Sequence, residues 1–293
     1  MTKAATVVLG VGATKSGTSW LYRYLADHPG CHLRTIKELH YFDGVEKGNL
    51  SDQAADRRRE VAAIQARIDA GRAGAGAQAR LRDRADWARV LDSGREDEAA
   101  YLGYLDDGRG TRSVVGEVTP AYALLPEERL RAMAGLGGRD VRFVYLMRDP
   151  VARLWSHVRM IAGRRAPDGA VSRRRCDRIL ARTLAGEETQ IEARGDYRAA
   201  LEKLARAIDP SRLLVLVFED LVGGDATARL CAFLGLAPRA PDLAPVHAGQ
   251  PMPMTPAQAH AARDWLAPQY DFVADRLGHR PAGWRFDLAE VGS

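Results

Sequence analysis

Residues 6–25, TVVLGVGATKSGTSWLYRYL, hold the clearest arrangement for chemistry in this sequence. An apolar run, Val7–Leu9, is followed by a small polar segment between Gly12 and Gly17 and then by an amphipathic run. A strand, a glycine-bearing loop and a helix form an anion cradle, because loop N–H groups and the positive helix end converge on the ligand. The segment therefore predicts a phosphate-binding loop.

The position of the lysine separates this loop from a Walker loop, which reads G-x-x-x-x-G-K-[ST]. Gly12 and Gly17 have the Walker spacing, but Thr18 stands where the lysine is required, and Lys15 lies before the second glycine. The loop is thus expected to bind an anion other than a nucleoside triphosphate. Its candidate ligand-binding residues are Lys15, Ser16, Gly17, Thr18, Ser19 and Trp20.

A second candidate anion site follows the apolar run Val141–Leu146, which ends in Arg148-Asp149-Pro150. Pro150 suits the first turn of a helix, and Asp149 can cap that helix. Arg148 would then lie at the carboxyl end of a strand and bind a phosphate through two N–H groups, with Ser156 two turns into the helix. The alternative is an ordinary capped helix with a surface arginine and an exposed serine.

The run KELHYFD, Lys37–Asp43, places two proton acceptors side by side. A carboxylate or an imidazole within hydrogen-bond reach of a hydroxyl can take its proton during group transfer. Glu38 and His40 are therefore both candidate bases. The alternative is a solvated Lys–Glu pair in a loop that the neighbouring aromatic residues anchor.

Apolar strands that alternate with helical patterns position these residues. Strands are predicted at 6–9, 113–115, 141–146 and 213–218, and helices at 19–27, 129–134, 151–162, 197–207, 227–234 and 256–266. This order predicts an α/β fold of the P-loop type, three layers with a central parallel sheet and helices on both faces. Ligands of such sheets bind at the carboxyl ends of the strands, here after Leu9 and Leu146.

Two regions and the chain ends differ from this alternation. Residues 52–92 are rich in Ala, Arg and Asp and fit an inserted pair of solvated helices. Residues 163–178 are basic and poor in apolar side chains, which favours a loop, and the stretch 238–256 is proline-rich and irregular. We expect a single domain over residues 1–293.

Composition excludes several functional classes. A net charge of +5 favours anionic ligands but is modest for a nucleic-acid binder, and aromatic residues make up only 7%. Three separated cysteines without a C-x-x-C pair support neither a disulfide framework nor a zinc site, and no metal site is predicted. No signal peptide or membrane-length apolar run is found, so a cytoplasmic protein is expected. The Ala/Arg-rich composition is typical of a GC-rich bacterial source.

The two anion motifs together resemble the sulfotransferase family that uses 3′-phosphoadenylyl sulfate (PAPS). Residues 14–21, TKSGTSWL, are similar to the family's 5′-phosphosulfate loop, and residues 148–156, RDPVARLWS, to its 3′-phosphate motif R-D-P-x-x-R-x-x-S. The resemblance implies that Lys15 stabilises the leaving-group oxygen and that Thr18 and Ser19 hold the 5′-phosphate. It also implies that Arg148 and Ser156 hold the 3′-phosphate and that PAPS is a co-substrate needing no metal.

Two further stretches resemble the carbohydrate, heparan-type branch of the family more than its cytosolic aryl branch. Glu38, His40 and Asp43 match an E-x-H-x-x-D pattern in which the glutamate is the base, whereas aryl enzymes use a histidine. The resemblance makes Glu38 the expected base and His40 and Asp43 its supporting groups, with His40 as the rival base.

The second stretch, VVGEVTPAY at 114–122, is similar to the branch pattern E-K-[ST]-P-x-Y, but Val118 replaces the lysine. Glu117 and Tyr122 are expected to line the acceptor cleft with Glu38 and His40; alternatively, Thr119-Pro120 is only a turn. The missing lysine makes heparan-like acceptors doubtful.

The expected function is sulfuryl transfer from PAPS to a hydroxyl of a carbohydrate or small natural product, without nucleic-acid or membrane partners. One alternative is a divergent P-loop kinase, against which Thr18 and the lack of a Walker-B carboxylate argue. Another is a non-catalytic nucleotide-binding protein on the same scaffold.

Overall fold

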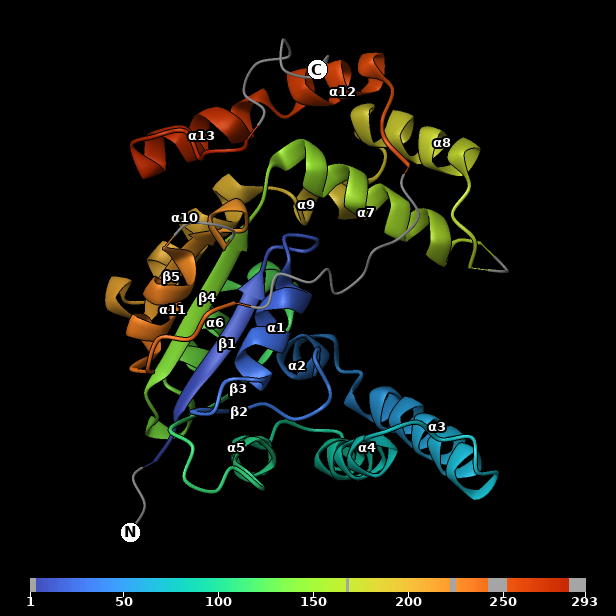
Figure 1. The fold of residues 1–293 in the computed structure, drawn as a ribbon, viewed down its shortest axis with the longest axis vertical. Helices are drawn as coiled ribbons and strands as arrows, with labels where there is room; N and C mark the ends of the chain where they lie inside the picture. Colours follow the sequence, from blue (N-terminus) through green and yellow to red (C-terminus); the bar gives the residue numbers. More distant parts are fainter. Residues whose placement is uncertain (1–3, 167–168, 222–224, 242–251, 285–293) are drawn as a thin grey trace.

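The computed structural model describes residues 4–166, 169–221, 225–241 and 252–284, which form a five-stranded parallel sheet with helices on both faces (Figure 1). The strand order is β2-β3-β1-β4-β5. The strands are β1 (Thr6–Gly12), β2 (Cys31–His32), β3 (Val114–Val118), β4 (Val141–Met147) and β5 (Leu213–Val217). The predicted three-layer α/β fold is thus confirmed; the two-residue strand β2 was not predicted, because it is too short to show a pattern.

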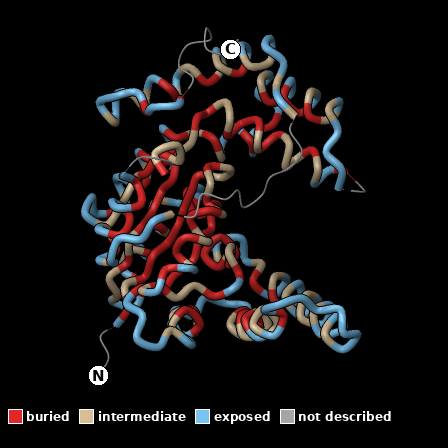
Figure 2. The backbone as a smooth tube through the Cα atoms, viewed as in Figure 1, coloured by how far each residue is buried: buried red, intermediate tan, exposed pale blue. Residues whose placement is uncertain are grey.

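The sheet is buried on both faces, which explains the continuous apolar runs of its strands. Alternate residues of a strand point to opposite faces. Val8 packs with helices α1 (Thr18–Ala26) and α11 (Ala226–Leu234), whereas Val7 and Leu9 pack with α6 (Glu127–Ala134) and α10 (Tyr197–Ala207). Figure 2 shows the strands as the buried centre of the molecule.

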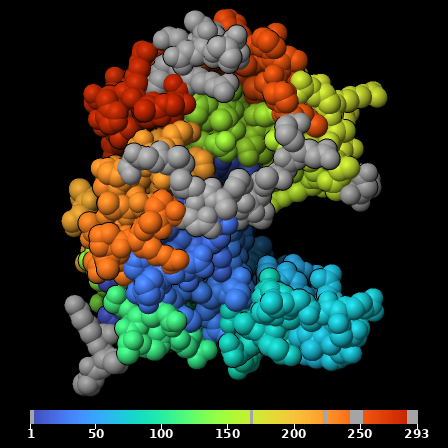
Figure 3. Space-filling model, viewed as in Figure 1, coloured from blue at the N-terminus to red at the C-terminus, as the bar shows by residue number. Residues whose placement is uncertain are grey.

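The predicted pair of helices over residues 52–92 is present as α3 (Leu50–Asp69) and α4 (Ala77–Leu91). The pair projects from the body as a lobe (Figures 1 and 3). Its anchor is the buried Arg34, which forms ion pairs with Asp83 and Asp86 of α4 and with Asp107. The fully buried Trp87 adds an apolar contact with Tyr104.

The other helices of the described residues pack outside this central part of the molecule. They are α2 (Tyr41–Lys47), α5 (Glu98–Asp106), α7 (Pro150–Arg164), α8 (Arg173–Leu184), α9 (Thr189–Ala193), α12 (Pro256–Trp265) and α13 (Ala267–Leu277). Short 3₁₀ turns occupy Pro120–Leu124, Leu136–Gly138, Pro210–Arg212 and Glu219–Leu221. None of the helices in the described ranges has the length and apolar character needed to cross a bilayer.

Two predictions made outside the sheet are corrected. The expected loop over 163–178 is helical from Arg173 onward, because Cys176, Ile179 and Leu180 bury one face of α8. A second helix, α13, follows the predicted last helix. Most of the irregular stretch predicted at 238–256 (242–251) lies outside the described residues.

Candidate active site

The loop after β1 has the backbone geometry of an anion cradle. Gly17 precedes α1 with a left-handed φ of 89°, and a Cβ there would come within 2.1 Å of the Phe218 ring, so only glycine fits. Helix α1 has no acidic residue in its first turn and no side-chain cap. The N–H groups of Gly17, Thr18 and Ser19 make no hydrogen bond within the described residues, so they are available to a ligand.

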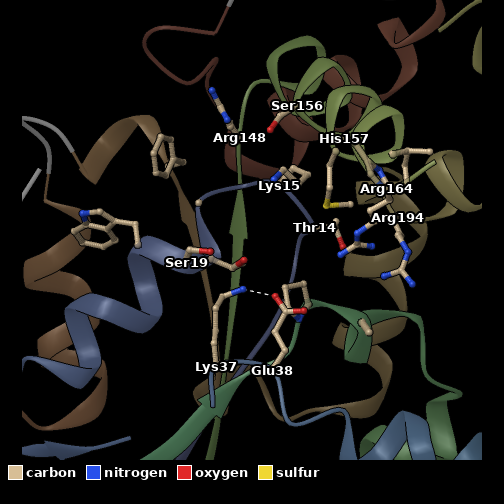
Figure 4. Close-up of a pocket in the computed structure, with 18 of the residues that line it drawn as sticks. Thr14, Lys15, Ser19, Lys37, Glu38, Arg148, Ser156, His157, Arg164 and Arg194 are labelled. Carbon is tan, nitrogen blue, oxygen red and sulfur yellow. Dashed lines mark hydrogen bonds and ion pairs between the residues drawn. The ribbon is translucent and has the colours of Figure 1, made fainter. Parts of the chain in front are cut away.

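The three sequence motifs meet at one cavity of about 640 Å³ (Figure 4). The β1–α1 loop contributes Lys15, the segment before α2 contributes Glu38, the β4–α7 connection contributes Arg148, and α7 contributes Ser156. The cavity is lined by Thr14, Lys15, Gly17, Thr18, Ser19, Trp20, Lys37, Glu38, His40, Pro120, Ala121, Arg148, Ser156, His157, Met160, Ile161, Arg164, Gln190, Arg194 and Phe218. Residues far apart in the sequence thus form a single site.

Ser16 is the exception among the predicted donor residues, because its side chain faces the core. It is fully buried and does not line the cavity; its Oγ lies 3.5 Å from the hydroxyl of Tyr197. That hydroxyl also donates to the carbonyl of Arg148 at 2.6 Å and accepts from the Arg148 N–H at 3.1 Å. Tyr197 therefore links the β1–α1 loop to the Arg148 segment on the side that faces the core.

Arg148 lies where the sequence predicted, between β4 and α7. Asp149 caps α7 by accepting a hydrogen bond of 2.8 Å from the Ala152 N–H, and Pro150 occupies the first turn. The guanidinium of Arg148 lies over the Phe218 ring, 5.4 Å from its centre, and lines the cavity. Asp149 thus caps the helix as predicted. Arg148 lines the cavity, which argues against the alternative of an ordinary surface arginine.

Lys15 stands in a strongly positive environment. Burial lowers its pKa, and the charges of Lys37, Arg164 and Arg148 lower it further, while Glu38 opposes them. Because these cations repel one another, the site gains stability when an anion binds among them.

Glu38 and His40 belong to a short chain of charged groups. Glu38 forms an ion pair with Lys37 through one oxygen, and its other oxygen lies 3.4 Å from Nε2 of His40. Nδ1 of His40 contacts Asp43 at 3.0 Å, and Asp43 also pairs with Lys47 at 3.0 Å. The predicted supporting roles of His40 and Asp43 are consistent with this geometry.

The same contacts set the protonation states of the two candidate bases. Burial would raise the pKa of Glu38, but hydrogen bonds from His40 and Lys37 outweigh it and lower the pKa to about 2. Hydrogen bonds to Asp43 and Glu38 raise the pKa of His40 to about 9. At neutral pH Glu38 is therefore ionised and can accept a proton, whereas His40 carries protons on both nitrogens and cannot.

Glu117 and Tyr122 do not line the cavity, contrary to expectation. Both are almost fully buried, and Glu117 accepts hydrogen bonds from the hydroxyls of Thr119 (2.6 Å), Tyr122 (2.7 Å) and Tyr101 (2.8 Å). Glu117 also accepts from the N–H of Leu39 at 3.1 Å. The two residues thus support the Glu38–His40 segment from the protein interior.

Several residues of the cavity were not predicted as site residues, namely Lys37, His157, Arg164 and Arg194. Lys37 could have been noticed as a second lysine beside the candidate base. The other three follow no motif and reach the cavity only through the packing of α7 and α9. Within the described ranges, no group of three or more His, Cys, Asp or Glu side chains is arranged to hold a metal ion.

Solved structures that are similar to this chain include a bacterial sulfotransferase with the same fold and two sulfotransferase domains. A sulfotransferase from Alicyclobacillus acidocaldarius aligns with 97% of this chain and 100% of its own, with 21% identity and a TM-score of 0.60. The sulfotransferase domain of the Synechococcus PCC 7002 olefin synthase aligns with 89% of this chain and 88% of its own, at 20% identity and a TM-score of 0.49. The corresponding domain of the curacin biosynthetic pathway covers 95% of this chain and 99% of its own, at 16% identity and a TM-score of 0.48.

Sequence comparison identifies the family. No curated protein is similar enough to be matched as a relative. The model of the sulfotransferase family, however, matches residues 8–240, which include the β1–α1 loop, the Glu38 segment and the Arg148 motif. The chain therefore belongs to the sulfotransferase family.

Proposed function

We propose that this chain transfers a sulfuryl group from PAPS to a hydroxyl of a carbohydrate or small natural product. The main observation in support of this proposal is that Lys15, Glu38 and Arg148 line one cavity. The cavity thus has cationic groups at two places, Lys15 and Arg148, and the carboxylate of Glu38 in the same space. Family membership supports sulfuryl transfer over the kinase alternative.

The residues of the cavity fit a donor with two anionic ends. The free N–H groups at the start of α1, with Thr18 and Ser19, would bind the 5′-phosphosulfate. Arg148 and Ser156 would bind the 3′-phosphate. The rings of Trp20 and Phe218 provide apolar surface in the same cavity.

In the transfer, the bond from sulfur to the 5′-phosphate oxygen breaks and a bond from sulfur to the acceptor oxygen forms. Lys15 stabilises the negative charge that develops on the leaving oxygen, which lowers the barrier because that charge is greatest in the transition state. The acceptor hydroxyl gives its proton to Glu38.

Glu38 is favoured over His40 as the base by their protonation states, with pKa values of about 2 and about 9. A doubly protonated His40 instead holds one carboxylate oxygen, leaving Glu38 oriented toward the cavity. A glutamate base is the feature of the carbohydrate branch, which supports placing the chain nearer to that branch.

Lys37 is proposed to replace the lysine missing at Val118. The N–H of Val118 donates to the carbonyl of Lys37 at 3.3 Å, so the two residues are neighbours although they come from different segments. The ammonium of Lys37 faces the cavity beside Glu38. A cation is thereby restored near the transferring group.

The first test is calorimetry with adenosine 3′,5′-bisphosphate, the product of donor cleavage, with magnesium and with a chelator. We expect equal binding in both conditions. Binding only of ATP with magnesium would instead favour the kinase alternative.

The second test measures formation of this bisphosphate from PAPS across a panel of hydroxyl acceptors. With an accepted substrate, Lys15→Ala should abolish transfer, and Glu38→Gln should lower kcat by about 10²–10⁴-fold without changing bisphosphate affinity. Lys37→Ala should lower kcat and Lys37→Arg should retain most of it. Tight bisphosphate binding without transfer to any acceptor would favour the non-catalytic alternative.

A further inference from the structure

Two arginines in the cavity are not accounted for by the donor motifs. Arg164 is the last residue of α7 and Arg194 follows α9, and both line the cavity. Neither forms a hydrogen bond or ion pair with any described residue. The adjacent Arg165, in contrast, forms two hydrogen bonds of 2.8 Å with Glu188. A carboxylate is therefore present nearby, yet it neutralises Arg165 and leaves the cavity arginines unpaired.

His157 adds a buried polar group without a partner to the same wall. It is only 1% exposed, and its Nδ1 has no hydrogen-bond partner in the described part of the chain. Burial and the charges of Arg153, Arg194 and Lys15 lower its pKa to about 3, so the ring is neutral. His157 therefore adds an uncharged polar ring, and no competing negative charge, to the cavity wall that carries the two arginines.

The two arginines lie apart from the proposed 3′-phosphate ligand. Figure 4 shows them grouped away from Arg148, the proposed 3′-phosphate ligand. Burial lowers the pKa of Arg194, which also senses the opposing charges of Asp43 and Glu38 and the like charge of Arg164. Arg194 is thus near both Arg164 and the candidate base, where an acceptor must place its hydroxyl.

We infer that Arg164 and Arg194 bind an oxyanion of the acceptor, so that the substrate is a hydroxyl compound bearing a carboxylate or a sulfate or phosphate ester. This inference rests on the proposed function. Guanidinium groups bind such anions through paired N–H donors, and two unpaired arginines at one wall provide several. Binding the anion would also orient the hydroxyl toward Glu38.

The test compares matched probes on enzyme saturated with adenosine 3′,5′-bisphosphate. Affinities for p-nitrophenyl β-D-glucuronide, the glucoside and the glucoside 6-sulfate are measured by calorimetry. We expect binding of an anionic probe at least tenfold tighter than that of the glucoside, and the two anionic probes distinguish a carboxylate from a sulfate ester. Arg194→Gln and Arg164→Gln should each weaken the anionic probe about ten- to a hundredfold. Arg174→Gln, an exposed arginine on α8, serves as the control for loss of one charge.

Three results would overturn the inference. One is equal affinity for the charged and neutral probes, and another is no detectable binding of either anionic probe. The third is weaker binding of PAPS, with unchanged bisphosphate binding, in the Arg164 or Arg194 variants, because the arginines would then hold the sulfuryl group. Failure of the wild type to bind the bisphosphate at all would instead refute the proposed function.

Discussion

At the residue scale, the proposed role of Glu38 as the base depends on the charges that surround Glu38 and His40. The two side chains are each 37% exposed and lie 3.4 Å apart. The pKa of His40 is raised by hydrogen bonds to Asp43 first and to Glu38 second, and the pKa of Glu38 is lowered because His40 and Lys37 outweigh the effect of burial. The sequence placed both residues together but left their roles open, since the roles depend on the contacts with Lys37 and Asp43.

Replacing His40 by Asn should raise the pKa of Glu38, because a positive charge and a hydrogen bond are lost. Since Glu38 must be ionised to accept a proton, the acidic limb of the kcat/KM profile should move to higher pH. Wild-type activity should not depend on Glu38 protonation above about pH 4, whereas the variant should lose activity as the pH falls from about 6 to about 4.

Lys47→Gln is the control for this pH profile, because Lys47 pairs with Asp43 and does not touch Glu38. Its acidic limb should match that of the wild type. An unchanged limb in His40→Asn would argue against Glu38 as the base.

At the scale of elements, a buried hydrogen-bond network supports the segment that carries Glu38, the proposed base. Glu117 at the end of β3 accepts from Leu39 in that segment and from Tyr101 in α5. The hydroxyl of Tyr122 accepts from the N–H of Tyr41 at 3.0 Å, at the start of α2. The aromatic rings of Tyr41 and Tyr101 stack with centroids 4.8 Å apart. The network fixes where Glu38 enters the cavity.

Glu117→Leu should lower the free energy of unfolding by about 3 kcal/mol, because buried hydroxyl and N–H donors lose their acceptor. Glu117→Gln keeps one accepting oxygen and should cost about 1 kcal/mol. Chemical denaturation measures both. Equal stability of the three proteins would show that the carboxylate does not hold the network together.

A second connection between elements passes through Tyr197 of α10. Tyr197→Phe leaves the N–H and carbonyl of Arg148 without their partner, so we expect a loss of about 1–2 kcal/mol in unfolding free energy. Affinity for adenosine 3′,5′-bisphosphate should also fall several-fold, since Arg148 is less firmly positioned. Calorimetry and denaturation give the two values.

Tyr22→Phe is the matched control for this prediction. The Tyr22 hydroxyl donates to the carbonyl of Arg34 at 2.6 Å, away from the cavity. The control should therefore lose stability and keep its nucleotide affinity. A similar loss of affinity in both variants would show that Tyr197 acts only through general stability.

Features that depend on a short segment could be predicted from the sequence, whereas features that depend on packing between distant segments could not. Strands β1, β3, β4 and β5 could be predicted, as could the candidate residues Lys15, Glu38 and Arg148 that line one cavity, because apolar runs and motif spacing are properties of short segments. Glu117, however, was expected at the cavity wall, and its burial depends on Tyr101 from a different helix. Arg194 likewise reaches the cavity through the packing of α9 against α7, which no local pattern records.

For the whole molecule, strand order places both anion motifs at one edge of the sheet. The neighbours β1 and β4 are parallel, so the loops that follow them, with Lys15 and Arg148, open on the same side. A donor bound to both loops would link α1 to α7 and stabilise the folded state as a unit.

Saturation with adenosine 3′,5′-bisphosphate should therefore raise the melting temperature, by roughly 5 °C at a hundredfold excess over Kd. Adenosine 5′-monophosphate, which lacks the 3′-phosphate, reaches only the β1–α1 loop and should give a smaller shift at equal concentration. Arg148→Gln should remove most of the difference between the two nucleotides, whereas Arg174→Gln should preserve it. Thermal shifts with a chelator present provide the comparison, and equal shifts for both nucleotides in the wild type would mean that Arg148 does not bind the 3′-phosphate.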